Sequence, residues 1–123
     1  MIIPSYLKPG DKIGICATAR WMTPEQMQPA IAEIKSWGLE VEIMDQVWSQ
    51  YGQLAGEDND RIAGLQACLL RDDIHAILIA RGGYGTVRVV DAIPHEMIVN
   101  HPKWLCGYSD ITVLHNKWND AGL

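Results

Sequence analysis

The sequence contains no apolar run approaching the roughly 20 residues that a membrane-spanning helix needs. Its first residues, Met1 to Ser5, include neither the basic segment nor the long apolar segment of a signal peptide. Positive charge is also scarce, because 10 Lys and Arg stand against 15 Asp and Glu and give a net charge of −5. Non-specific nucleic-acid and anionic-membrane binders are normally basic. We therefore expect a cytoplasmic protein with neither nucleic acid nor membrane as a partner.

The cysteines give no sign of a disulfide framework or a zinc site. Only Cys16, Cys68 and Cys106 are present, in no CxxC or Cys/His spacing. We expect reduced, buried thiols, with Cys106 facing the core. The acidic run 57–60 lacks the spacing of a calcium loop and is better explained as charges at a helix start. We expect no metal site and no cofactor.

The chain has the size and composition of one domain, residues 1–123, and shows no internal repeat or low-complexity tract. It has 123 residues, of which 48% are hydrophobic and 20% charged. About two-thirds of the surface of such a chain can be buried on folding, so a core needs no disulfide or metal. The composition also argues against intrinsic disorder.

Apolar segments of strand length alternate with segments of helical periodicity. The predicted strands are residues 12–17, 39–44, 76–80 and 104–107. The predicted helices follow Thr23, Asp58 and Gly85, with the third ending at Ile93, and a fourth carries Ile111, Leu114 and Trp118. This alternation predicts an α/β fold with three layers, α/β/α, and a mostly parallel, flavodoxin-like or class I amidotransferase-like sheet.

Two local features complicate this assignment. Thr23 and Gln26 have the spacing of a capping box, but Pro29 lies inside the helix that they would start. We expect Pro29 either to kink this helix or to move its start to near Gln28. The polar stretch 45–56 is predicted to be a long loop, and loops of that length are often functional.

Parallel sheets bind ligands beyond the carboxyl ends of their strands. Three loops are expected at that edge here: Thr18 to Met22, Arg81 to Gly85, and Tyr108 to Asp110. One of them, Gly107-Tyr108-Ser109-Asp110, matches most of the nucleophile elbow G-x-S-x-G. Such a turn exposes the serine hydroxyl and sets the next N–H at a helix start, where an oxyanion is stabilised. The alternative is that Ser109 or Asp110 merely caps the following helix.

The second loop is Arg81-Gly82-Gly83-Tyr84-Gly85, directly after the third strand. Its glycines would let the backbone approach a ligand, and one N–H could join that of Asp110 in a two-donor oxyanion hole. A phosphate cradle or a turn without any ligand are the alternatives. Arg81 could pair with a substrate carboxylate in bidentate fashion or form a surface salt bridge.

A serine nucleophile needs a base, and none of the four histidines suits Ser109. His115 is six residues further along the same helix, about 9 Å along its axis and about 240° around it. His75, His95 and His101 fall mainly at the opposite edge of the sheet. If Ser109 is a nucleophile, its base and the orienting acid lie outside these 123 residues.

The motifs resemble those of the LD-carboxypeptidases, the muramoyl-tetrapeptide carboxypeptidase family of serine peptidases. The resemblance covers nearly the whole chain, but only the family's N-terminal domain. The matching segments are Pro9-Gly10-Asp11-Lys12-Ile13, Ala55-Gly56 with Asp58 and Arg61, Arg81-Gly82-Gly83-Tyr84-Gly85 with Arg88, Pro102-Lys103, and Gly107-Tyr108-Ser109-Asp110-Ile111-Thr112. The sequence departs from the family at Ala17-Thr18-Ala19-Arg20, where a Pro-Ser pair is usual.

The resemblance implies a Ser-His-Glu triad with Ser109 as nucleophile and with the Glu and His in a separate C-terminal domain. Asp110 and Gly83 would supply the oxyanion-hole N–H groups, and Arg81, Gly82 and Tyr84 would contact substrate. The implied reaction releases the terminal D-alanine of muropeptide tetrapeptides during cell-wall recycling. The family further implies that this domain is inactive without its C-terminal domain, and that members pair as homodimers.

Two other functions remain open on the sequence. The chain also resembles the microcin C immunity peptidases of the same superfamily, which would imply cleavage of an acyl-adenylate. A flavodoxin-like domain could instead bind a small ligand without catalysis. Reactivity of Ser109 toward a fluorophosphonate in the complete protein would argue against this last function.

Overall fold

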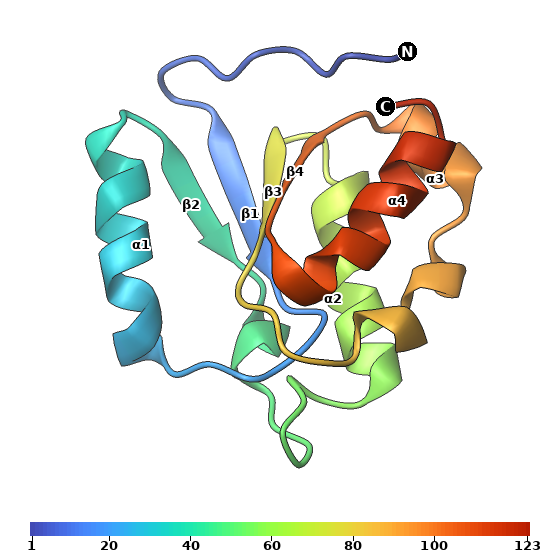
Figure 1. Cartoon of the computed structure of the whole chain (residues 1–123). Coiled ribbons are helices and arrows are strands. Elements are labelled where there is room, and N and C mark those ends of the chain that lie inside the picture. Colours follow the sequence, from blue (N-terminus) through green and yellow to red (C-terminus); the bar gives the residue numbers. More distant parts are fainter.

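Four parallel strands form one sheet in the order β2-β1-β3-β4 (Figure 1). The computed structural model describes all 123 residues. The strands are β1 (Lys12–Cys16), β2 (Glu40–Ile43), β3 (Ala76–Ile79) and β4 (Trp104–Cys106). Every neighbouring pair is parallel. The order is that of the first strands of a flavodoxin-like sheet, so the predicted fold class is confirmed.

Helices cover both faces of this sheet and complete the predicted three layers (Figure 1). Helix α1 (Pro24–Ser36) lies on one face; α2 (Asp58–Leu70), α3 (His95–Asn100) and α4 (Thr112–Asp120) lie on the other. None of these helices has the length and apolarity that crossing a bilayer requires.

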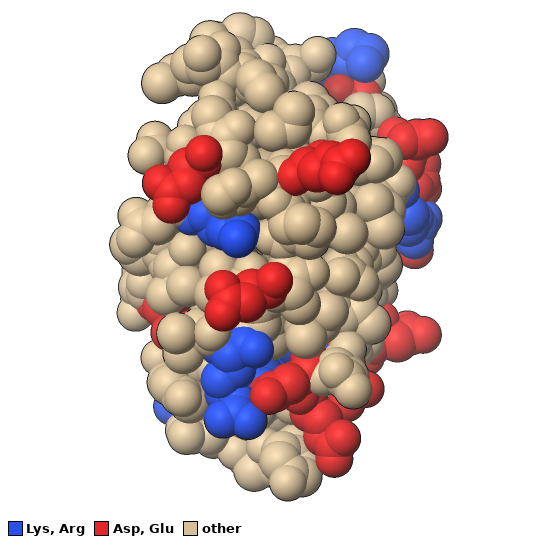
Figure 2. Space-filling view, turned by 90° about the vertical axis from the view of Figure 1, so that its right-hand side faces the viewer, with Lys and Arg blue, Asp and Glu red and all other residues tan.

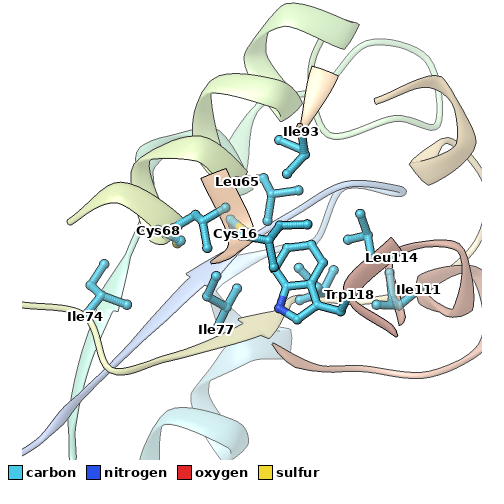
Figure 3. Close-up of a cluster of buried hydrophobic side chains, with 12 residues drawn as sticks. Cys16, Leu65, Cys68, Ile74, Ile77, Ile93, Ile111, Leu114 and Trp118 are labelled. Atoms are coloured by element: carbon cyan, nitrogen blue, oxygen red, sulfur yellow. The ribbon is translucent and has the colours of Figure 1, made fainter. Parts of the chain in front are cut away.

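Alternate residues of the strands feed two apolar clusters, one on each face. Ile13 and Ile15 point toward α1, whereas Cys16 and Ile77 join the larger cluster beneath α2 and α4 (Figure 3). Gly14 allows α2 to approach β1 closely, since a Cβ there would lie 2.9 Å from the sulfur of Cys68. Both faces of β1 are therefore fully packed.

Helix α1 begins where the capping box predicts, and not near Gln28. The Gln26 N–H donates to Thr23 Oγ1 at 3.3 Å, and the Thr23 N–H donates to Gln26 Oε1 at 3.0 Å. Pro29 lies inside the helix with its ring on the exposed side. The cap and the burial of Met27 and Ile34 outweigh the one backbone hydrogen bond that Pro29 removes.

The chain between β3 and β4 differs from the prediction of one helix over 86–93. It forms two short 3-10 turns, Thr86–Arg88 and Val90–Ala92, and then α3 after Pro94. Five β-branched residues between positions 86 and 93 disfavour a continuous α-helix, and Pro94 suits a helix start because it needs no N–H partner. The predicted loop 45–56 likewise contains a 3-10 turn, Asp45–Trp48.

Two further sequence expectations are wrong in detail. Helix α2 is capped by Glu57, one residue before Asp58, and the Glu57 N–H donates to the Asp60 carboxylate at 2.9 Å. Cys106 is exposed, while Cys16 and Cys68 are buried. Strand β4 lies at the edge of the sheet, and its Leu105 packs against the larger cluster. The next residue, Cys106, therefore points to the opposite face, where α1 does not reach β4.

Charged side chains are interspersed over the surface. Figure 2 shows the side of the molecule that lies at the right of Figure 1, and acidic and basic groups alternate there without a broad basic area. This distribution matches the excess of acidic residues in the sequence.

Candidate active site

The topology gathers three loops at the carboxyl edge of the sheet, at the bottom of Figure 1. Strands β1 and β3 are neighbours, yet the chain leaves β1 toward β2 and leaves β3 toward β4. Such a switch point opens a crevice between the two departing loops. A cavity of about 230 Å³ lies here. It is lined by Arg20, Arg81, Gly82, Gly83, Tyr108 and Ser109.

Ser109 has the backbone conformation of a nucleophile elbow. Its φ of 61° makes it the only residue other than glycine with a positive φ. Such strain persists only where the surrounding structure enforces it, and it is common at functional sites. Gly107 is part of the reason for the tight turn, because a Cβ there would lie 2.8 Å from Ile111 Cγ2. The turn leaves the side chain of Ser109 exposed at the end of β4.

Neither Ser109 nor Asp110 caps a helix with its side chain. A 3-10 turn, Ser109–Ile111, precedes α4, and no side chain makes a capping hydrogen bond at either start. The Asp110 carboxylate instead accepts the backbone N–H of Thr86 at 3.0 Å. Capping therefore does not explain the residues of this loop.

Three backbone N–H groups in the two loops at this edge have no acceptor. The N–H groups of Gly82, Gly83 and Asp110 donate to no acceptor within the chain. Gly82 lies against the serine, since a Cβ at Gly82 would be 3.3 Å from Ser109 Cβ and 3.5 Å from Ser109 Oγ. Unpaired N–H groups beside a hydroxyl are the arrangement that stabilises an oxyanion.

Hydrogen bonds join the three loops into one unit. Thr18, after β1, and Thr86, after the glycine-rich loop, share a buried hydrogen bond of 2.7 Å between their hydroxyl oxygens. The Thr86 N–H reaches Asp110 in the third loop. The position of Ser109 is thus coupled to both neighbouring loops.

Arg61 supports this unit from below, a role that the sequence analysis missed. Its wholly buried guanidinium donates through Nη1 to the carbonyl oxygens of Thr18 and Gly85, both at 2.9 Å. Burial lowers its pKa, although Asp58 opposes this by pairing with Nη2. The Arg88 guanidinium also binds Asp58 through two 2.9 Å hydrogen bonds and lowers the pKa of that carboxyl.

One signal in the sequence could have exposed Arg61. It lies four residues before Leu65 and seven before Cys68, on the face of α2 that is otherwise apolar. An arginine at such a position must find partners inside the protein.

The structure brings most of the predicted site residues together and adds two, Arg20 and Tyr108. Arg81, Gly82, Gly83 and Ser109 line the same cavity, whereas Tyr84 does not line it and is 48% exposed. Asp110 adjoins Ser109 without lining the cavity. The Arg20 side chain crosses Gly83 so closely that a Cβ at Gly83 would collide with it.

A second cavity, of about 480 Å³, adjoins the first and shares Arg81, Gly82 and Tyr108 with it. It extends over the face of β3 toward α1, with Leu78 and Ala30 among its mostly apolar lining. The site therefore combines a polar cavity with an apolar one.

No general base faces Ser109. Neither of the two adjoining cavities is lined by a histidine or a carboxylate. His75 accepts the Lys12 N–H at 3.1 Å and lies 3.7 Å from Asp11, at the amino edge of the sheet. His115 lines a groove beneath the N-terminal segment. The geometric prediction that these histidines lie away from Ser109 is confirmed.

Comparison with known proteins agrees with the fold and the motifs. Residues 13–123 match the family model described as "LD-carboxypeptidase N-terminal domain". Over 112 residues the chain is 38% identical to the "Probable murein peptide carboxypeptidase" of Bacillus subtilis (strain 168), covering 91% of this chain and 35% of that one.

Solved structures give the same picture. The muramoyltetrapeptide carboxypeptidase from Oxalobacter formigenes superposes with a TM-score of 0.81 at 26% identity, covering 90% of this chain and 37% of that one. An MccF-like protein from Bacillus anthracis str. Ames superposes with a TM-score of 0.92 at 24% identity, covering 98% and 38%. This last likeness concerns the fold alone.

The chain spans little more than a third of the length of these relatives, since it covers 35% to 38% of each. The family model accounts for all but its first twelve residues. The chain belongs to the LD-carboxypeptidase family, in which it corresponds to the N-terminal domain.

Proposed function

We propose that this chain is the nucleophile-bearing N-terminal domain of a serine LD-carboxypeptidase that removes the terminal D-alanine from muropeptide tetrapeptides in cytoplasmic cell-wall recycling. The observation that carries the proposal is Ser109, held at a φ of 61° beside the unpaired N–H groups of Gly82, Gly83 and Asp110. The family of the chain supports the class of reaction.

In the proposed mechanism, Ser109 Oγ attacks the carbonyl carbon at the L-centre of diaminopimelate and passes its proton to a base. The N–H groups of Gly83 and Asp110 stabilise the oxyanion, with Arg81, Gly82 and Tyr84 as substrate contacts. The C–N bond then breaks, and D-alanine leaves with the proton returned by the base. Water hydrolyses the resulting ester and regenerates the serine.

The base and its orienting acid come, in this proposal, from a second domain of a longer protein. Two observations support this: no histidine or carboxylate lines the cavities beside Ser109, and the 112 residues that match the Bacillus subtilis relative make up only 35% of that protein. The 123 residues alone are then expected to be inactive.

The test uses the full-length protein with a diaminopimelate-containing muropeptide tetrapeptide, and mass spectrometry follows the loss of one alanine. We expect release by the wild type and a drop of at least about 1,000-fold in Ser109→Ala. Ser36→Ala, at an exposed serine ending α1, is the matched control and should keep wild-type activity.

Equal release by wild type and Ser109→Ala would show that the elbow serine is not the nucleophile. No release by a folded wild type would remove this substrate. An aminoacyl-adenylate analogue, assayed in parallel, then tests the alternative resemblance to microcin C immunity peptidases, and Ser109-dependent cleavage of it would establish that function instead.

A further inference from the structure

The five arginines of the chain divide into two groups. Arg61, Arg71 and Arg88 each pair with at least one carboxylate. Arg20 and Arg81 form no ion pair and no side-chain hydrogen bond. In a chain with five more acidic than basic residues, two arginines without acidic partners are unexpected.

Both unpaired arginines line the cavity that contains Ser109. They come from different loops, Arg20 after β1 and Arg81 directly after β3, so they meet only because β1 and β3 are neighbours. No carboxylate lines this cavity. The two positive charges beside the serine are therefore not balanced by any acidic group within the cavity.

The backbone holds Arg20 in place. Arg20 forms an isolated bridge with Leu54, and its two neighbours are fixed by hydrogen bonds, Ala55 N–H to Ala19 carbonyl at 2.9 Å and Trp21 N–H to Gln53 carbonyl at 3.3 Å. Gly83 leaves room for the Arg20 side chain, which lies so close that a Cβ at this position would clash with it. The long 45–56 loop thus serves to position Arg20.

We infer that Arg20 and Arg81 form a carboxylate-binding pair that selects peptides ending in a free carboxylate next to the bond that Ser109 attacks. A guanidinium binds a carboxylate through two parallel hydrogen bonds and keeps its charge at any physiological pH. A carboxypeptidase substrate carries such a group one residue beyond the scissile bond. The inference rests on the function proposed above, which it extends with a specificity residue, Arg20.

Arg20 stands in the segment where the family usually has a Pro-Ser pair, so the residue distinguishes this chain from that pattern. It lines the cavity and is solvent-exposed, which means that it can be replaced without leaving a buried group unpaired. Arg20→Gln and Arg20→Lys should both fold.

The experiment measures binding in the full-length protein with Ser109→Ala, so that no turnover occurs. Isothermal titration compares a diaminopimelate-containing tetrapeptide ending in D-alanine with the same peptide ending in D-alanine carboxamide. We expect Arg20→Gln to weaken binding of the free acid about 10- to 100-fold and to leave the carboxamide unchanged. Arg20→Lys should fall between, and Lys35→Gln, at an exposed lysine of α1, should change neither.

Equal weakening of acid and carboxamide, no effect of Arg20→Gln, or no binding of the acid at all would each overturn the inference. Titration with AMP tests the other anion that two arginines could bind, a phosphate. Arg20-dependent binding of AMP without discrimination between the two peptides would assign the pair to phosphate and overturn the carboxylate assignment. Loss of hydrolysis in the wild type with acid-selective binding intact would refute only the proposed reaction.

Discussion

The two edges of the sheet differ in whether their polar groups have partners within the chain. At the amino edge, Lys12 binds Asp73 at 3.0 Å, and Lys103 donates to the carbonyl oxygens of Cys68 and Arg71 at the end of α2. At the carboxyl edge, the N–H groups of Gly82 and Gly83 have no partner. Partnered polar groups stabilise a fold, whereas unpartnered ones are available to a ligand.

The same contrast separates two sets of residues that could be taken for catalytic groups. His75 and Asp11 form a pair that resembles part of a catalytic triad, but His75 accepts a backbone N–H from Lys12 and stands at the end of the sheet away from Ser109. Its role is structural. The strained Ser109, with no side-chain partner, is at the other edge.

Between the carboxyl edge of the sheet and the apolar core lies a layer of buried polar groups, nearly all of which are hydrogen-bonded. Arg61 holds Thr18 and Gly85 by their carbonyl oxygens, and only its Nε lacks a partner among buried side-chain atoms. The unpaired N–H groups of the site are thus held in position by the hydrogen bonds that Arg61 makes to the neighbouring loops.

Arg61→Met should give the largest loss of stability, because it removes the buried hydrogen bonds that support the loops at the carboxyl edge. Two carbonyl oxygens lose their buried donor, and we expect a loss of about 3 kcal/mol in the free energy of unfolding, measured with urea. Arg71→Met is the control at the amino edge, where the arginine is 39% exposed and the change should be much smaller. Similar losses in both variants would contradict the layered arrangement.

Gly83→Ala should have an intermediate effect that falls mainly on the site. Gly83 has a φ of 128°, and a Cβ would displace Arg20. We expect a loss of about 1 kcal/mol in unfolding free energy together with weaker preference for peptides with a free carboxylate. Gly10→Ala is the matched control: Gly10 has a φ of 90° before β1, but no atom lies within 4 Å of its Cβ position. It should destabilise the fold and leave that preference intact.

The sequence allowed the prediction of features that depend on neighbouring residues. The elbow at Ser109, the glycines before it and the capping box at Thr23 are local patterns, and the structure contains all of them. The sequence did not allow the prediction of two longer-range contacts. These are the hydrogen bond of Arg61 to Thr18, 43 residues away, and the approach of Arg20 to Gly83. Such contacts depend on strand order, which local periodicity does not determine.

The smallest predicted effect concerns Asp11, at the amino edge, and depends on pH. The Lys8 backbone N–H donates to its carboxylate at 3.0 Å and lowers its pKa, helped by the Lys8 ammonium and His75. A carboxyl whose pKa is lower in the folded state stabilises the protein above its unfolded pKa of about 3.9, and this contribution is lost as the pH falls through the folded pKa. Asp11→Asn keeps an acceptor but loses the charge.

We therefore expect the melting temperature of Asp11→Asn to lie about 2 to 4 °C below that of the wild type at pH 7, with the gap closing as the pH falls below about 4. Asp91→Asn, at an exposed carboxylate without an ion pair, controls for the loss of one negative charge. Activity of the full-length protein should be unchanged in both variants. A loss of activity in Asp11→Asn at unchanged stability would mean that the amino edge takes part in the reaction, and the division between the two edges would fail.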